Sequence, residues 1–155
     1  MTRRRPYTTA SSGTLARWLA SEPPSARVAV RDAEAALLVL LPLLTADGAP
    51  LDHERAAVVA LDARRTVIDA AVLTTGSHRQ TLMDPAHILR WALTRERPCV
   101  CLIIAHNHPS GDPAPSKEDR AVTYAMRNAA HTIGLELLDH LVIGAAGTYR
   151  SAMHD

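Results

Sequence analysis

Apolar residues are densely spaced in the first third of the chain and fall into shorter, strand-like runs in the rest. Between Asp32 and residue 44 almost every position is apolar, and aspartate caps a helix N-terminus well, so a helix is predicted there. A shorter helix is predicted over 14–20, and the polar residues 1–13 are expected to form a disordered basic tail. Residues 14–50 therefore form a predicted N-terminal helical segment.

From residue 51 onward the pattern changes to short runs rich in Val and Ile. Two of them, 56–61 and 66–73, flank a polar turn and predict an antiparallel hairpin. The continuous apolar run 99–105 is typical of a strand buried on both faces. A further strand is predicted over 135–143, followed by a closing turn or short strand at 144–151.

Two helices are predicted between these strands. One begins at Asp84 and Pro85, because aspartate is a good cap and proline suits the first helical position. The other begins at Ser116. Its predicted apolar face consists of Ala121, Val122, Ala125, Met126, Ala129 and Ile133. The alternation of strands and helices indicates one layered α/β domain over residues 51–155.

The composition and charge of the chain mainly restrict which classes of function are expected. The chain has 155 residues, of which 47% are hydrophobic and 21% charged, as in ordinary soluble proteins. A net charge of +1 argues against nucleic acid as a partner, and the one basic cluster is 3–5. No apolar run reaches the ~20 residues of a membrane span. Cys99 and Cys101 are too close to suggest a disulfide framework, so a reduced, cytoplasmic protein is expected.

The residues that carry chemistry gather in the segment 106–119. His106 and His108 are two residues apart, so in an extended chain their imidazoles point to the same side. A loop stiffened by three prolines follows. Asp119, eleven residues after the second histidine, is expected to bring a carboxylate back to the two imidazoles. Two imidazoles and a carboxylate can hold Zn²⁺ and leave a fourth position for water. The segment therefore predicts a catalytic zinc site.

Parts of this array also have purely structural explanations. Ser116 followed three residues later by Asp119 suits a helix N-terminus without any metal, and the two histidines alone could lie in a solvated loop. The coincidence of several independent spacings favours the metal interpretation. A base beside the water is needed as well, and Glu54 is the candidate. Spacing alone does not choose it over Glu34 or Glu96.

The last two thirds of the chain resembles the RadC-like branch of the JAB/MPN (JAMM) metalloprotease superfamily. The resemblance is strongest at 106–111, where the sequence reads His-Asn-His-Pro-Ser-Gly, together with Pro115, Ser116 and Asp119. Supporting residues are Glu54, Asp62, Gly76 and 138–144.

This resemblance implies a fold, a metal and a reaction. The fold would be a mixed β-sheet flanked by helices, similar to the deaminase-like architecture. His106, His108 and Asp119 would be the Zn²⁺ ligands, Glu54 the general acid/base, and Ser116 the residue whose hydroxyl helps to stabilise the oxyanion. The implied reaction is hydrolysis of a peptide or isopeptide bond in a protein or peptide, a ubiquitin-like conjugate being one such substrate.

Some alternatives stay open at this level. Full-length RadC-like proteins carry a helix-hairpin-helix region suited to DNA, so a DNA-associated role is one alternative, although the residues before Glu54 lack its Gly-rich hairpins. A non-catalytic scaffold that only binds partners is another. The apolar helical stretch 37–44 could bury itself or form a homodimer. His140 could be a hydrogen-bonded core residue, or it could orient a ligand from outside the coordination sphere.

Overall fold

The computed structural model describes residues 28–46, 49–50, 52–76 and 83–154. The helix predicted over 14–20 and the basic tail lie outside these residues. Within the part of the chain described, no helix is both long and apolar enough to cross a membrane.

Strands and helices alternate along the described chain. The elements are α2 (Ala33–Leu44), β1 (Thr45–Ala46), β2 (Ala49–Pro50), β3 (Glu54–Leu61), β4 (Val67–Gly76), α3 (Pro85–Leu93), β5 (Cys101–Asn107), α4 (Lys117–Thr132), β6 (Glu136–Ile143), the 3₁₀ turn η2 (Ala145–Gly147) and β7 (Tyr149–Ser151).

The main sheet has five strands in the order β4-β3-β5-β6-β7. Strand β3 pairs antiparallel with β4 and β5, β5 runs parallel to β6, and β6 is antiparallel to β7. Helix α4 joins the parallel pair, because parallel neighbours need a long crossover connection. The predicted hairpin and the predicted mixed α/β sheet in a single domain are therefore confirmed.

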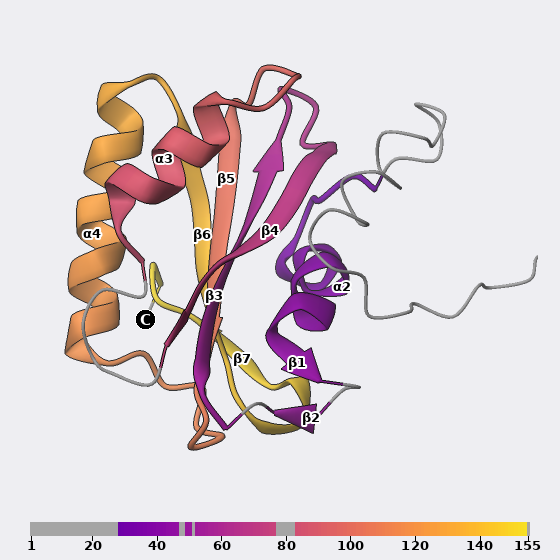
Figure 1. Ribbon diagram of the computed structural model, residues 1–155, viewed down its shortest axis with the longest axis vertical. Helices are drawn as coiled ribbons and strands as arrows, with labels where there is room; N and C mark the ends of the chain where they lie inside the picture. The colour runs from indigo at the N-terminus through magenta and orange to yellow at the C-terminus, as the bar shows by residue number, and fades with distance from the viewer. Residues whose placement is uncertain (1–27, 47–48, 51, 77–82, 155) are drawn as a thin grey trace, which may run out of the picture.

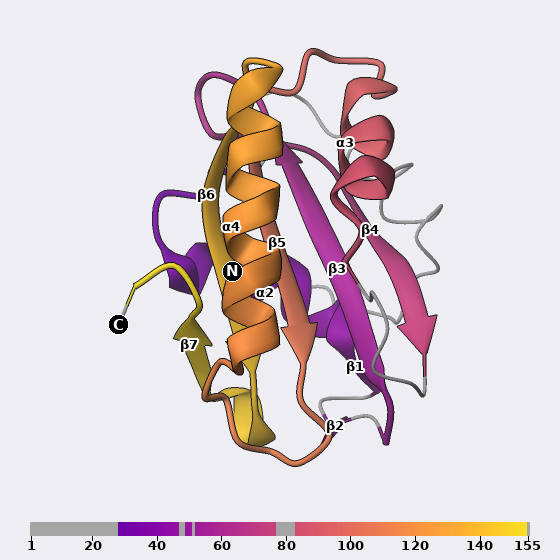
Figure 2. The same ribbon diagram turned by 90° about the vertical axis from the view of Figure 1, so that its left-hand side faces the viewer.

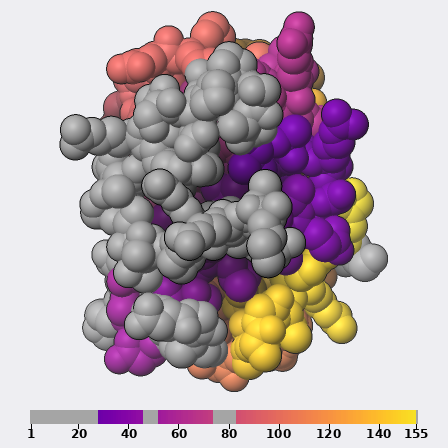
Figure 3. Space-filling model, turned by 90° about the vertical axis from the view of Figure 1, so that its right-hand side faces the viewer, coloured from indigo at the N-terminus to yellow at the C-terminus, as the bar shows by residue number. Residues whose placement is uncertain are grey.

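Helices cover both faces of this sheet. Helix α2 lies against one face, and α3 and α4 lie against the other (Figures 1 and 2). Helix α2 lies beside the C-terminal segments drawn in yellow (Figure 3). There the Tyr149 hydroxyl donates a hydrogen bond of 2.8 Å to the carboxylate of Glu34. The helix packs on the same sheet as the rest of the domain, and the boundary near residue 50 stays a prediction.

Each face of the sheet has its own apolar core, and β5 contributes to both. Its Ile103 packs on the α2 side, whereas Leu102 and Ile104 pack on the side of α3 and α4. All seven residues of β5 are buried, which confirms the strand predicted to be buried on both faces.

The predicted helix starts are also confirmed. Asp32, Asp84 and Ser116 each accept a hydrogen bond from a backbone N–H two or three residues further on. These bonds satisfy donors that have no partner inside the helix.

The predicted end of the buried strand was wrong. Strand β5 begins at Cys101 and continues through His106 and Asn107, because their backbones still pair with β3 or β6. His106 therefore lies within the strand rather than in the loop that follows it.

The predicted apolar face of α4 was also partly wrong. The helix buries Thr123, Met126 and Ala130, whereas Ala121 and Ala125 are exposed. Thr123 takes a place on the buried face, where its hydroxyl contacts the ring of His140 on β6.

Candidate metal centre

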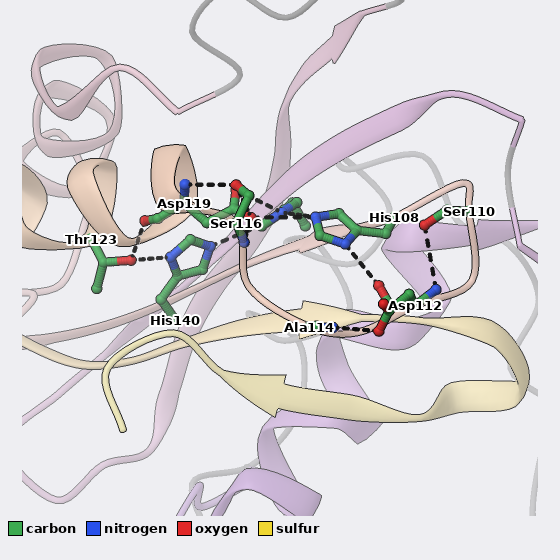
Figure 4. A network of polar contacts seen from close by, with 9 residues as sticks. His108, Ser110, Asp112, Ala114, Ser116, Asp119, Thr123 and His140 are labelled. Atoms are coloured by element: carbon green, nitrogen blue, oxygen red, sulfur yellow. Dashed lines mark hydrogen bonds and ion pairs between the residues drawn. The ribbon is translucent and has the colours of Figure 1, made fainter. Parts of the chain in front are cut away.

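The predicted ligands His106, His108 and Asp119 converge where β5 ends and α4 begins. The Nε2 atoms of the two histidines lie 3.0 Å apart. Asp119 Oδ1 lies 3.1 Å from Nε2 of His106, and Asp119 Oδ2 lies 3.4 Å from Nε2 of His108. Figure 4 shows His108 and Asp119 turned toward each other. The three side chains form a group that could hold a metal ion.

The geometry fits a zinc ion. Bonds of ~2.0–2.1 Å at tetrahedral angles place two nitrogens roughly 3.3 Å apart, close to the separations observed here. The side chains of His108 and Asp119 are 16% and 15% exposed, so the group is shielded yet reachable from solvent. Two imidazoles and a carboxylate are also a donor set that zinc accepts with a fourth position left for water.

A backbone carbonyl holds His108 in the tautomer that a ligand needs. Its Nδ1 lies 2.8 Å from the carbonyl oxygen of Asp112 (Figure 4). A carbonyl can only accept, so Nδ1 carries the hydrogen, and Nε2 is the atom available to the metal.

The loop that supplies this carbonyl packs tightly on the turn between β6 and β7. The N–H of His108 donates to the carbonyl of Ile143, and the N–H of Ala145 donates to the carbonyl of Gly111, both at 2.8 Å. A Cβ at Gly144 would lie only 2.4 Å from that Gly111 oxygen. Glycine at 144 therefore lets the loop approach closely enough to orient His108.

The start of α4 anchors Asp119. Its Oδ2 accepts hydrogen bonds from the backbone N–H and the hydroxyl of Ser116 at 2.7 and 2.6 Å. The N–H of Asp119 in turn donates to the Ser116 hydroxyl oxygen at 3.0 Å, which completes a capping box. Since Oδ2 is held in this way, Oδ1 faces His106 as the free ligand atom.

The electrostatics of the group favour a positive charge at its centre. Burial raises the pKa of Asp119, but hydrogen bonds from His106, His108 and Ser116 outweigh it and hold that pKa well below its usual range. The hydrogen bond to Asp119 raises the pKa of His108, with burial acting against it. A proton or a metal ion can supply the charge that this arrangement favours.

A buried polar chain lies behind His106. His140 is fully buried, and its Nε2 lies 2.9 Å from Nδ1 of His106. Its Nδ1 lies 2.5 Å from the hydroxyl of Thr123, which is 2.6 Å from the backbone carbonyl oxygen of Asp119 (Figure 4). Burial and the charge of His106 lower the pKa of His140 to about 3, so its ring is neutral. His140 is thus a hydrogen-bonded core residue that also contacts a predicted ligand.

Glu54 is the first residue of β3, and its side chain is half-buried. Ala56, two positions further on, pairs with His106 across the sheet. Because alternate residues of a strand share a face, Glu54 lies on the same face as His106. Its negative charge also contributes to the raised pKa of His108.

The buried side chain of Asn107 fixes the end of β3 that carries Glu54. Its Oδ1 accepts a hydrogen bond from the N–H of Arg55 at 2.7 Å, and its Nδ2 donates to the carbonyl of His53 at 3.0 Å. These backbone groups lie on either side of Glu54, so one amide holds the strand at both points.

Sequence reasoning missed Asn107 and Thr123. The sequence motif includes Asn107 but assigns it no role, although strand alternation places it on the opposite face, where a buried amide needs partners. Thr123 follows Asp119 by four residues, one helical turn along the same face, and this spacing could have identified it.

Comparison with known proteins agrees with the sequence motif. The family model of the RadC-like JAB domain matches residues 31–155. A UPF0758 protein of Symbiobacterium thermophilum is 39% identical over 128 residues, which cover 83% of this chain and 52% of that protein. A UPF0758 protein of a Picosynechococcus species is 40% identical over 121 residues, 78% of this chain and 47% of the relative.

A third UPF0758 protein, from Thermotoga maritima, is 37% identical over 99 residues, 64% of this chain and 44% of the relative. The chain thus spans about half the length of the curated relatives it matches. Their names state no activity, so the chemistry has to be argued from the site itself.

Proposed function

This chain belongs to the RadC-like JAB domain family, and from that premise we propose that it is a zinc-dependent hydrolase that cleaves a peptide or isopeptide bond. The observation that carries the proposal is the convergence of His106, His108 and Asp119, whose ligand atoms lie within 4.8 Å of one another. Glu54, on the same face of the sheet, supports it as the acid/base that such a reaction needs.

In this proposal the ligand atoms are Nε2 of His106, Nε2 of His108 and Oδ1 of Asp119. When bound, a zinc ion polarises a carbonyl oxygen and lowers the pKa of water. Asp119 supplies the only negative charge among the three ligands, because both imidazoles bind in their neutral form. The site therefore keeps a net positive charge, which favours the oxyanion that forms during hydrolysis.

Glu54 is the proposed general acid/base. Its carboxylate takes a proton from water as the water oxygen attacks the carbonyl carbon of the substrate. It then returns that proton to the amine nitrogen as the carbon–nitrogen bond breaks, so that a carboxylic acid and an amine leave. The contacts of Asn107 with the backbone on either side limit the movement of Glu54 between these two steps.

Ser116 is the proposed oxyanion donor. Its hydroxyl hydrogen points to Oδ2 of Asp119 and would have to turn toward the oxyanion during the reaction. The backbone N–H of Ser116 still holds Oδ2 at 2.7 Å when the hydroxyl turns away, so Asp119 keeps its position.

The proposed substrate is a protein or peptide, a ubiquitin-like conjugate being one such substrate, and the proposed location is the cytoplasm. Parallel assays distinguish the two bond types: a library of linear peptides, and peptides joined through a lysine side-chain amine. Mass spectrometry of the products identifies the bond that is cut.

The test combines metal content with activity. We expect about one zinc per chain by elemental mass spectrometry in the wild type and in Glu54→Gln, and none in Asp119→Ala. Hydrolysis should fall by roughly 10²–10⁴-fold in Glu54→Gln, the usual contribution of a general acid/base. The matched control is Glu118→Gln, an exposed carboxylate in the first turn of α4, which should keep full activity.

Two results would contradict the proposal. One is a folded wild-type chain that neither retains zinc nor takes it up when zinc is added. The other is a Glu54→Gln variant that hydrolyses the substrate at the wild-type rate.

A further inference from the structure

The hydroxyl of Thr123 has a hydrogen-bond direction that the geometry determines. Its oxygen lies 2.6 Å from the backbone carbonyl oxygen of Asp119. Two oxygens this close need a hydrogen between them, and a carbonyl has none to give. Thr123 therefore donates to Asp119, and toward His140 its oxygen can act only as an acceptor.

This direction is passed on to the two buried histidines. The Thr123 oxygen lies 2.5 Å from Nδ1 of His140, so that nitrogen must carry a hydrogen and donate it. The side chain of His140 is fully buried, which favours its neutral form with a single N–H. The Nε2 atom of His140 is then an acceptor, and Nδ1 of His106, 2.9 Å away, is its donor.

We propose that Thr123 and His140 are positioning residues that hold His106 in its metal-binding tautomer through this one-way chain of hydrogen bonds. With the hydrogen on Nδ1, the lone pair of His106 Nε2 faces His108 and Asp119. The inference rests on the metal site proposed above. It adds that two residues outside the ligand set govern the affinity of this site for zinc.

In this series of hydrogen bonds Asp119 has two roles. Its Oδ1 faces the site as a ligand, and its backbone carbonyl is the fixed acceptor from which the direction of the chain starts. The orientation of His106 on β5 is thereby coupled to the first turns of α4 through His140 on β6. A shift of α4 would disturb two ligands together.

The reverse direction is unfavourable on the same geometry. If Thr123 donated to His140, no hydrogen would lie between the Thr123 and Asp119 oxygens, and the two would repel at 2.6 Å. The hydrogen of His106 would then sit on Nε2, the atom that has to bind the metal. Loss of a partner that orients a metal ligand typically weakens metal binding by about 10–100-fold.

Helix α4 supplies a matched control for this idea. Thr132 donates to the carbonyl of Asn128 at 2.9 Å, just as Thr123 donates to the carbonyl four residues earlier. Thr132, however, is exposed. Thr123→Val keeps the shape of the side chain and removes the hydroxyl. Thr123→Ser keeps the hydroxyl, and Thr132→Val removes the equivalent bond away from the site.

Two measurements test the inference on the full chain. Two-bond ¹H–¹⁵N spectra of the zinc-free protein at about pH 9, where imidazoles are neutral, show which nitrogen carries the hydrogen. We expect Nδ1–H in both His106 and His140 of the wild type and mixed tautomers in Thr123→Val. Zinc affinity, from competition with a chromophoric chelator, should fall about 10–100-fold in Thr123→Val. It should stay within about threefold of the wild type in Thr123→Ser and Thr132→Val.

A hydrogen on Nε2 of His106 in the wild type overturns the inference, and so does a Thr123→Val variant with wild-type tautomers and affinity. If the wild type binds no zinc, the proposed function fails, whereas the tautomer spectra still decide the inference, so the two failures are distinguishable. If circular dichroism shows that Thr123→Val does not fold, the wild-type spectra alone decide the direction of the hydrogen bonds from His106 to Asp119.

Discussion

The side-chain oxygen of Asn107 accepts a hydrogen bond from the backbone N–H of Arg55 at 2.7 Å. The amide nitrogen of the same side chain donates to the carbonyl of His53, on the other side of Glu54. Asn107 itself lies between the two histidines of the candidate metal centre. One buried amide thus ties the strand of the ligands to the strand of the proposed acid/base.

Replacing Asn107 with Ala is expected to reduce catalysis while the metal stays bound. The backbone on both sides of Glu54 loses its anchor, so kcat should fall with zinc content unchanged. The free energy of unfolding should fall by about 1–3 kcal/mol, because a partly buried N–H and carbonyl lose their partner. Elemental analysis, steady-state kinetics and urea unfolding measure the three effects.

The control for this change is Asn128→Ala, which removes an exposed amide from α4 and should leave kcat and zinc content unchanged. If Asn107→Ala loses its zinc together with its activity, the side chain supports the ligands rather than Glu54.

Zinc binding should weaken as the pH falls. The hydrogen bond to Asp119 raises the pKa of His108, so its ring holds a proton to a higher pH than the ordinary value of about 6.5. Zinc must displace this proton at any pH below the raised value. Apparent affinity should therefore fall by up to about tenfold per pH unit for each proton displaced.

The pKa of Asp119 is shifted downward, so this carboxylate stays ionised and adds nothing to the pH dependence near neutrality. Calorimetry between about pH 5.5 and about pH 8.5 should detect proton release that grows toward acid pH. A zinc affinity that does not change over this range would contradict the proposed role of His108.

Gly144→Ala should weaken zinc binding from outside the ligand set. The new Cβ would lie 2.4 Å from the carbonyl oxygen of Gly111 and 2.8 Å from Cδ of Pro113, so the loop has to move. His108 would then lose its contact with the carbonyl of Asp112. We expect weaker zinc binding and a loss of about 1–3 kcal/mol in the free energy of unfolding, as in overpacked interiors.

Gly134→Ala is the comparison for that variant. Gly134 has a φ of +78° but no atom within 4 Å of an added Cβ, so only backbone strain arises, at a cost of about 1–2 kcal/mol. Its zinc affinity should equal that of the wild type. Equal zinc affinity in Gly144→Ala and Gly134→Ala would show that the loop does not orient His108.

The features that could be predicted from sequence are those set by nearby residues. The helix starts at Asp32, Asp84 and Ser116 follow from a capping side chain and the apolar pattern behind it. The convergence of His106 and His108 follows from strand alternation over two residues. Such signals do not depend on which strands later become neighbours.

The features that escaped prediction depend on partners far away in sequence. Asn107 bonds backbone groups 52 and 54 residues earlier, and these contacts exist only in one register of β3 against β5. The contact of Thr123 with His140, 17 residues later, likewise depends on how α4 packs against β6. Glu54 was chosen by resemblance, since spacing alone could not place it on the face of His106.

Cys99 and Cys101 should resist alkylation in the folded chain. Burial raises the pKa of both thiols, that of Cys99 to about 11. At neutral pH the thiolate fraction of Cys99 is then about two orders of magnitude below that of a cysteine with the ordinary pKa of 9.0. Iodoacetamide labelling followed by mass spectrometry should show slow modification in buffer and rapid modification in urea. Equal rates in both would contradict the burial of these thiols.

Ser116→Ala separates the structural role of this residue from its proposed chemical one. The variant removes the acceptor of the Asp119 N–H, so the free energy of unfolding should fall by about 0.5–2 kcal/mol. The backbone N–H of Ser116 still holds Oδ2 of Asp119, so zinc should remain bound. If the hydroxyl also donates to the oxyanion, kcat should fall by about 10²–10³-fold with little change in KM.

Ser116→Thr decides between the two roles, because threonine keeps both the cap and the hydroxyl. It should restore stability and most of kcat together. A Ser116→Ala variant that is less stable but turns over at the wild-type rate would leave Ser116 as a helix cap alone. In that case the proposed stabilisation of the oxyanion would have to come from the bound metal.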